Sequence, residues 1–199
     1  MPDAFEVLRT DHAEVEQMLA VLQNTPGRTA GAGQTVLAAR QEVAQRLVID
    51  SSRHEAAEEQ YFWPIVRERL ADGGDLADQA TAQEQEAKEA LARLDKLEAS
   101  DAEFDQVLDA FIPAARRHIE FEETRVWPGL RQALSATEAR ELGDKLAKAK
   151  QHGPTRPHPH TPASPEILKA AGPAVAAADK LRDAVTGRGQ DASSSPSQG

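Results

Sequence analysis

The chain has 199 residues, enough for one ordinary domain with an extension. Its 33 acidic and 23 basic residues give a formal net charge of -10, and such a field repels a phosphate backbone, so we expect no nucleic-acid partner. The absence of cysteine excludes disulfide scaffolds, thiolate zinc sites, iron–sulfur clusters and thiol catalysis. The first residues lack the basic and apolar segments of a secretory signal, and no run approaches the roughly 20 apolar residues that cross a bilayer. These features predict a soluble cytoplasmic protein without a membrane partner.

Apolar residues at helical spacing predict four long helices, over about 3–23, 34–70, 75–99 and from Ser100 to beyond Val126. Turn-forming clusters at 24–27 and 72–74 separate them, and Pro64 is expected to kink or end the second. Capping-box patterns begin at Ser100 and Ser135, the latter opening a shorter helix that runs to about Gln151. The fold class expected is all-α: an antiparallel up-down four-helix bundle with a short fifth helix.

The composition changes after Gly153, where prolines recur and the last residues are rich in serine. Residues 1–152 are therefore expected to form the bundle, and residues 153–199 a flexible Pro-, Ala- and Ser-rich C-terminal tail. An Ala-rich stretch at 166–185 could form a helix that docks on the bundle. The tail is also a candidate segment for binding a protein partner.

A twelve-residue segment occurs twice, once in the second and once in the fourth predicted helix. Residues 53–64 align without gaps on residues 117–128, with six identical positions that include the chain's only two tryptophans. Each copy contains His-x-x-x-Glu: His54 with Glu58, and His118 with Glu122. Residues four apart share a helix face, and here that face is the apolar one. Two such helices facing each other would bring two imidazoles and two carboxylates into one low-dielectric space.

Two more polar residues lie on apolar stripes: His12 in the first helix and Glu84 in the third. Buried, unpaired carboxylates are strongly disfavoured, whereas a pair of cations would offset their charge. Mixed imidazole and carboxylate ligands suit iron, manganese or zinc, and facing helices of a bundle can hold such sites. The pattern therefore predicts a metal centre inside the bundle.

The set of motifs resembles the hemerythrin-like HHE cation-binding family, over about residues 3–150. The resemblance rests on a histidine in the first helix and on His-x-x-x-Glu-Glu followed by an aromatic residue and proline in the second and fourth. It implies two non-haem iron ions with an oxo or hydroxo bridge, or manganese or zinc in their place. It also implies that Glu58 and Glu122 bridge the ions. The implied ligands are His12, His54, Glu58, His118 and Glu122.

The third helix departs from the family, because no histidine lies between His54 and His118. Glu84 occupies the inward position and is expected to replace the missing ligand. Gln85 is the alternative, since it matches the family histidine if the alignment shifts by one.

Other polar residues lie within the two copies of the repeat. Glu55, Glu59 and Glu123 are expected at the rim of the site, although Glu55 could reach a metal. Tyr61 is either a packed side chain with its hydroxyl at the surface, or a redox-active phenol or metal ligand.

The leading functional hypothesis is a di-iron protein that binds, senses or detoxifies oxygen, peroxide or nitric oxide, with peroxidase- or catalase-like turnover as one form. Reversible oxygen transport is less expected, because the resemblance ties it to a more His-rich shell. The alternative is an iron-handling or iron-sensing module without turnover. A structural bundle that holds no metal is the third hypothesis.

Overall fold

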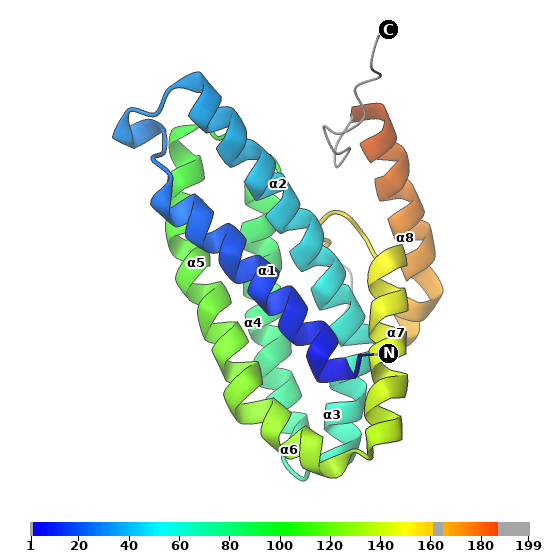
Figure 1. The fold of residues 1–199 in the computed structure, drawn as a ribbon. Coiled ribbons are helices and arrows are strands. Elements are labelled where there is room, and N and C mark those ends of the chain that lie inside the picture. The colour runs from blue at the N-terminus through cyan, green and yellow to red at the C-terminus, as the bar shows by residue number, and fades with distance from the viewer. Residues whose placement is uncertain (1, 161–164, 187–199) are drawn as a thin grey trace, which may run out of the picture.

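The computed structural model describes residues 2–160 and 165–186, with the backbone alone for 165–171 and 186. Within these ranges every regular element is a helix (Figure 1). The elements are α1 Ala4–Asn24, η1 Arg28–Ala30, α2 Gln34–Ala57, η2 Glu58–Phe62, α3 Trp63–Arg69, α4 Gly73–Leu94, α5 Ala102–Phe121, η3 Glu122–Val126, α6 Trp127–Ala133, α7 Ala136–His152 and α8 Pro165–Thr186.

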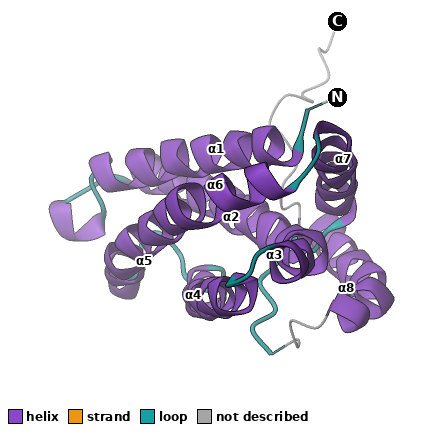
Figure 2. Cartoon of the chain, turned by 90° about the horizontal axis from the view of Figure 1, so that it is seen from below, coloured by secondary structure: helices purple, strands orange, loops and turns teal. Residues whose placement is uncertain are grey.

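Four helical rods form an antiparallel bundle: α1, α2 continued by α3, α4, and α5 continued by α6 (Figures 1 and 2). Each rod contacts the next one along the chain, and α1 also contacts α5, which closes the bundle. The predicted up-down bundle is thus confirmed. The fifth helix, α7, packs outside it against α1 and α2. No helix in the described part of the chain is long and apolar enough to cross a membrane.

A single π turn interrupts the second rod and another interrupts the fourth, at equivalent positions of the repeated segment. These turns are η2, from Glu58 to Phe62, and η3, from Glu122 to Val126. In each, the N–H of the following tryptophan bonds to the carbonyl five residues earlier, and a proline comes next. Proline has no N–H but is tolerated in the first turn of an α-helix, and π turns are frequent at functional sites. Pro64 therefore does not end the second rod but lies in the first turn of α3, which follows the widened turn.

The two capping-box predictions have different outcomes. The Ser135 hydroxyl accepts from the Glu138 N–H, and the Glu138 carboxylate accepts from Ser135 N–H, so this box is confirmed. The box at Ser100 does not form, because α5 begins at Ala102 after Asp101. The Asp101 carboxylate accepts from the Glu98 N–H in the preceding turn instead, at 2.8 Å.

The apolar core is divided into two clusters, one towards each end of the bundle. One contains Phe5, Phe62 and Trp127, and the other contains Leu19, Leu47 and Phe104. Along every rod the predicted site residues lie between the positions that feed the two clusters. The polar residues therefore form a layer enclosed by apolar side chains on both sides, away from bulk water.

The region from residue 153 onward contains α8, which spans the Ala-rich stretch where a helix was expected. It contacts the π turn η2 of the bundle. The loop before it is held by Asp179, which is fully buried and accepts from the N–H groups of Thr155 and Arg156. Gln85 of α4 also donates to the carbonyl of Pro159, at 3.0 Å. Residues 187–199 of the expected tail lie outside the described residues.

Gly73 and Gly74 begin α4 and provide a matched test of the close contact between α3 and α4. A Cβ on Gly73 would overlap the carbonyl oxygen of Val66, whereas a Cβ on Gly74 would meet no atom within 4 Å. We expect Gly73→Ala to lower the free energy of unfolding by about 1–3 kcal/mol, since the overlap is with backbone. Gly74→Ala should leave it unchanged or raise it by up to about 1 kcal/mol through helix propensity. Urea unfolding followed by circular dichroism measures both, and equal stability of the two variants would contradict the close contact.

Candidate metal centre

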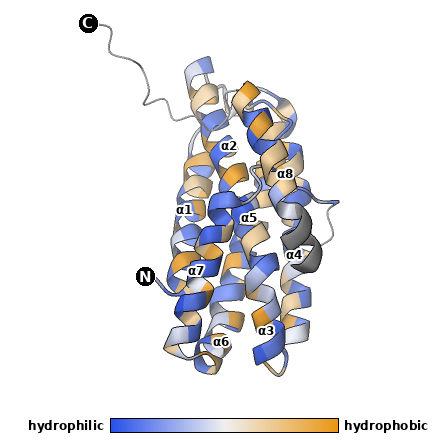
Figure 3. Cartoon of the chain, turned by 90° about the vertical axis from the view of Figure 1, so that its right-hand side faces the viewer, coloured by the Kyte–Doolittle hydropathy of each residue, from blue (hydrophilic) through white to orange (hydrophobic). Residues whose placement is uncertain are grey.

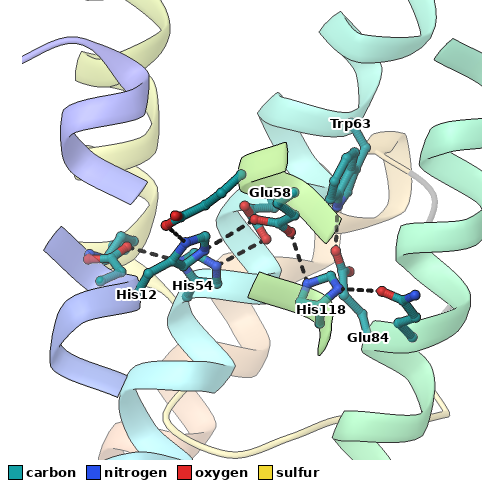
Figure 4. A network of polar contacts seen from close by, with 11 residues as sticks. His12, His54, Glu58, Trp63, Glu84 and His118 are labelled. Carbon is teal, nitrogen blue, oxygen red and sulfur yellow. Dashed lines mark hydrogen bonds and ion pairs between the residues drawn. The ribbon is translucent and has the colours of Figure 1, made fainter. Parts of the chain in front are cut away.

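Six side chains converge in the polar layer between the two apolar clusters (Figure 4). They come from all four rods of the bundle, and Glu58 lies between the histidines of α1 and α2 on one side and His118 on the other. They form two groups of four, within each of which one ligand atom per residue lies within 4.8 Å of the others. The groups are His12, His54, Glu58 and Glu122, and Glu58, Glu84, His118 and Glu122. The structure thus brings together all six residues predicted from the sequence, and both groups share two carboxylates.

The shared carboxylates, Glu58 and Glu122, are fully buried and each faces imidazole nitrogens. The Nε2 atom of His54 lies 3.2 Å from Oε2 of Glu58, one helical turn away. On the other rod, Nε2 of His118 lies 2.9 Å from Oε1 of Glu122. Glu122 also approaches α1, because its Oε2 is 3.2 Å from Nε2 of His12. Both repeat copies therefore aim their imidazole and carboxylate inward, as the four-residue spacing predicts.

Each of the three histidines is held from outside by an oxygen on its other ring nitrogen. An acceptor at Nδ1 favours the tautomer with the proton there, which leaves the Nε2 lone pair directed into the cluster. Metal-binding histidines are oriented in this way by outer acceptors. The pairs are His12 with Glu123 at 2.9 Å, His54 with Asp11 at 3.1 Å, and His118 with Gln83 at 3.0 Å.

Two of these outer acceptors, Asp11 and Gln83, are absent from the sequence-based predictions. Each immediately precedes a predicted ligand, His12 or Glu84, but holds a histidine on a different rod. The sequence gives no signal for such a pair, because the partners are brought together only by the packing of one helix on another.

Several atoms in the cluster are buried without a hydrogen-bond partner among the described residues. Each of these atoms faces the centre of the cluster and can donate a lone pair to a cation there. The unpartnered atoms are Nε2 of His12 and His118, both carboxylate oxygens of Glu58 and Glu122, and Oε2 of Glu84. Leaving buried polar atoms unpaired is costly, at about 1–3 kcal/mol each. The donor set and its orientation therefore fit bound metal ions.

Glu84 is the carboxylate that stands where the family places a histidine. It is fully buried, and the Trp63 indole N–H donates to its Oε1. Gln85, the alternative ligand, points away from the cluster and donates to Glu89 and to the Pro159 carbonyl. The second tryptophan has another role, since the ring of Trp127 stacks on His12 with centroids 5.2 Å apart.

The protonation of the cluster without metal is governed by burial and by its own charges. Burial, with repulsion from Glu58, raises the pKa of Glu84 well above its usual value. Burial and the Glu122 charge likewise raise the pKa of Glu58. At His54, burial disfavours the cation, but the carboxylates of Glu58 and Asp11 outweigh it and raise the pKa. The metal-free cluster therefore retains protons that bound cations would displace.

The acidic residues beside the ligands are more buried than expected. Glu59 is 5% exposed and forms an ion pair with Lys88 of α4, which the sequence did not indicate. Glu55 is 6% exposed and belongs to neither group of four. Burial raises the pKa of Glu55 to about 7.

The fold and the site together define a class: a helical bundle whose interior carries a histidine- and carboxylate-lined cation-binding cluster. Comparison with known protein families identifies which family within this class the chain belongs to. Residues 3–130 match the hemerythrin HHE cation-binding domain, and the chain belongs to this family.

Two relatives illustrate the match. An uncharacterized hemerythrin-like protein of Schizosaccharomyces pombe is 30% identical over 139 residues, which are 69% of this chain and 68% of the relative. The crystal structure of a hemerythrin HHE cation-binding domain-containing protein from Mycobacterium kansasii has a TM-score of 0.62 at 20% identity. That comparison covers 76% of this chain and 86% of the other, and it establishes a shared fold.

The stability of the metal-free protein should fall as the pH rises from about 5 to 8. The pKa values of Glu55 and Glu84 are higher in the folded state than in the unfolded state. Above about pH 4.5 the unfolded state loses these protons more easily, so the free energy of unfolding falls as the pH rises. Histidines with raised folded pKa values, His54 and His118, add to the decline only above about pH 6.5, where the unfolded imidazole loses its proton. Thermal unfolding in EDTA between pH 5 and 8 measures the trend.

A variant isolates one contribution to this pH dependence. The free energy of unfolding of metal-free protein should decline less steeply between pH 4.5 and 7 in Glu55→Gln, by up to about 3 kcal/mol. That amount corresponds to a shift in the pKa of Glu55 from 4.5 to about 7 on folding. Glu14→Gln, an exposed carboxylate of α1, is the control and should leave the slope unchanged. A metal-free protein that gains stability over this range would contradict the protonation scheme.

Proposed function

We propose that the cluster holds two metal ions, with iron as the physiological metal, and that the protein binds, senses or detoxifies oxygen, peroxide or nitric oxide. The observation that carries the proposal is the sharing of Glu58 and Glu122 by two groups of four ligand residues. Each ion would have two residues of its own: His12 and His54 for one, and His118 and Glu84 for the other. The two shared carboxylates would lie between the ions.

Charge balance supports two cations instead of one. Three carboxylates are fully buried in the cluster, and the oxygens of Glu58 and Glu122 face only imidazole nitrogens among the described residues. A single divalent ion would leave negative charge in a low-dielectric interior, where uncompensated charge is costly. Two ions with shared carboxylates are a known arrangement between facing helices of a bundle.

The mixture of three imidazoles and three carboxylates suits iron, and manganese or zinc less specifically. Bound iron would supply a redox-active Lewis acid with room for an exchangeable ligand. The chain's own part is to hold and orient: Asp11, Glu123 and Gln83 fix the imidazoles, and the Trp63 indole holds one oxygen of Glu84. The carboxylate of Glu84 makes the set richer in oxygen ligands than a histidine there would. This supports activation or detoxification of the ligand over reversible oxygen carriage.

The iron-sensing alternative is favoured by one observation, namely the cost of ionising the cluster without metal. Raised pKa values at Glu58 and Glu84 mean that these buried carboxyls ionise unfavourably unless a cation offsets their charge. Metal would then control the stability of the bundle without any turnover. Assays of peroxide consumption and of nitric oxide or oxygen binding on iron-loaded protein separate the two readings.

Removing ligands singly tests the assignment of each ion. Wild type purified from iron-supplemented cells should contain about two irons per chain by elemental analysis. His12→Ala should retain about one ion, and His118→Ala should also retain about one, because each removes a ligand of a single ion. Glu122→Ala should lose both, since its carboxylate belongs to both groups. The absorption bands of a bridged iron pair should disappear in all three.

The control variant is His158→Ala, which removes a histidine that pairs with Asp179 outside the cluster. It should keep both ions and the spectrum. If wild-type protein contains no stoichiometric metal, the proposal is wrong. If every ligand variant loses the same single ion, the assignment of two ions is wrong.

A further inference from the structure

A cavity of about 310 Å³ lies beside the metal cluster but outside it. It is bounded by α2 and η2 of the bundle, by α7, by residues 153–158 and by α8. The helices α7 and α8 both lie on the side of the bundle that faces the viewer in Figure 3. Its volume is at the small end of the range for organic ligand sites, about 300–1,000 Å³.

The floor of the cavity carries an unsatisfied acceptor. Glu55 lines the cavity and is 6% exposed, yet its Oε2 has no hydrogen-bond partner among the described residues. In the second copy of the repeat the same position is Ile119, so the repeated motif does not require a carboxylate here. A buried acceptor without a donor is costly, and a ligand that donates a hydrogen bond would remove that cost.

The walls limit the charge of that ligand. Three charged side chains along the cavity are already paired: Lys88 with Glu59, Arg156 with Asp183, and His158 with Asp179. Lys148, which is exposed, also lines the cavity. An anion would be repelled by Glu55 itself. A cation beside Glu55 would also lie near the ammonium group of Lys88, which already interacts with Glu55 and is paired with Glu59. A neutral hydrogen-bond donor avoids both.

Other parts of the wall are apolar and include the ring of Tyr61 and the prolines at 154, 157 and 173. Flat rings and prolines pack well against an aromatic or aliphatic body. We propose that this cavity binds a small neutral molecule whose apolar or aromatic body carries a hydroxyl group that donates to Glu55. The proposal does not depend on which metal the cluster holds.

Phenol and anisole provide a matched pair of probes, because they have the same ring and only phenol can donate. Tyr61 is the chain's only tyrosine, so full-length protein labelled with 3-fluorotyrosine gives a single fluorine NMR signal at the cavity wall. We expect phenol to shift this signal saturably, with a dissociation constant about tenfold lower than that of anisole. The same result is expected for metal-free and zinc-loaded protein, so failure of the metal proposal would leave the titration interpretable.

Two variants test the cavity and its acceptor separately. Glu55→Met keeps the length of the side chain but removes the acceptor, and should reduce phenol binding to the level of anisole. Gly172→Leu adds a side chain where a Cβ meets no atom within 4 Å, and should fill the cavity and abolish binding of both probes. Leu181→Ala is the control on the same helix, since Leu181 is 71% exposed and does not line the cavity.

Circular dichroism establishes that each variant is folded before its titration is compared. A shift that grows linearly with phenol, or equal affinities of the wild type for phenol and anisole, would overturn the proposal. So would unchanged phenol binding in folded Gly172→Leu.

Discussion

The constraint on which the structure depends is the enclosure of three carboxylates and three imidazoles between two apolar clusters. Charged groups in such an interior must be paired, protonated or bound to cations. The surrounding residues serve this requirement: Asp11, Glu123 and Gln83 hold the imidazoles, the Trp63 indole donates to Glu84, and the buried pair of Glu59 and Lys88 lies alongside. The unpartnered oxygens that remain face inward. The protein can therefore be understood as a bundle built around buried carboxylates whose charge bound cations would offset.

The repeated segment explains why the cluster has near-symmetric halves. Each copy supplies one histidine and one carboxylate, and each carboxylate is the first residue of a π turn that precedes a Trp-Pro pair. The halves differ in what the other two rods contribute, since α1 provides a histidine and α4 provides Glu84. Two ions bound there would have unequal surroundings, one with two imidazoles and the other with one. Because their protein ligands would differ, the two ions would interact differently with an external ligand.

The first copy of the repeat also faces the segment that follows α7. Asp179 holds the loop at Thr155 and Arg156, and α8 contacts η2. Glu55, one residue after a candidate ligand, lines the cavity beside this segment and belongs to neither group of four candidate ligands. The C-terminal region thus adds a second chemical environment next to the metal centre, separated from it by the residues of a single helical turn.

The sequence by itself determined the bundle, the doubled motif and all six residues of the cluster, because a 3.6-residue period and a four-residue spacing fix which side chains share a face. It also placed Glu84 inward, although it left Gln85 open. Tertiary structure alone decided which groups hold the histidines, since Asp11 and Gln83 act across to other rods. It likewise decided the burial of Glu55 and Glu59, which depends on α4, α7 and the chain beyond residue 152. Local periodicity encodes a helix face, whereas contacts between distant segments arise only when the helices pack.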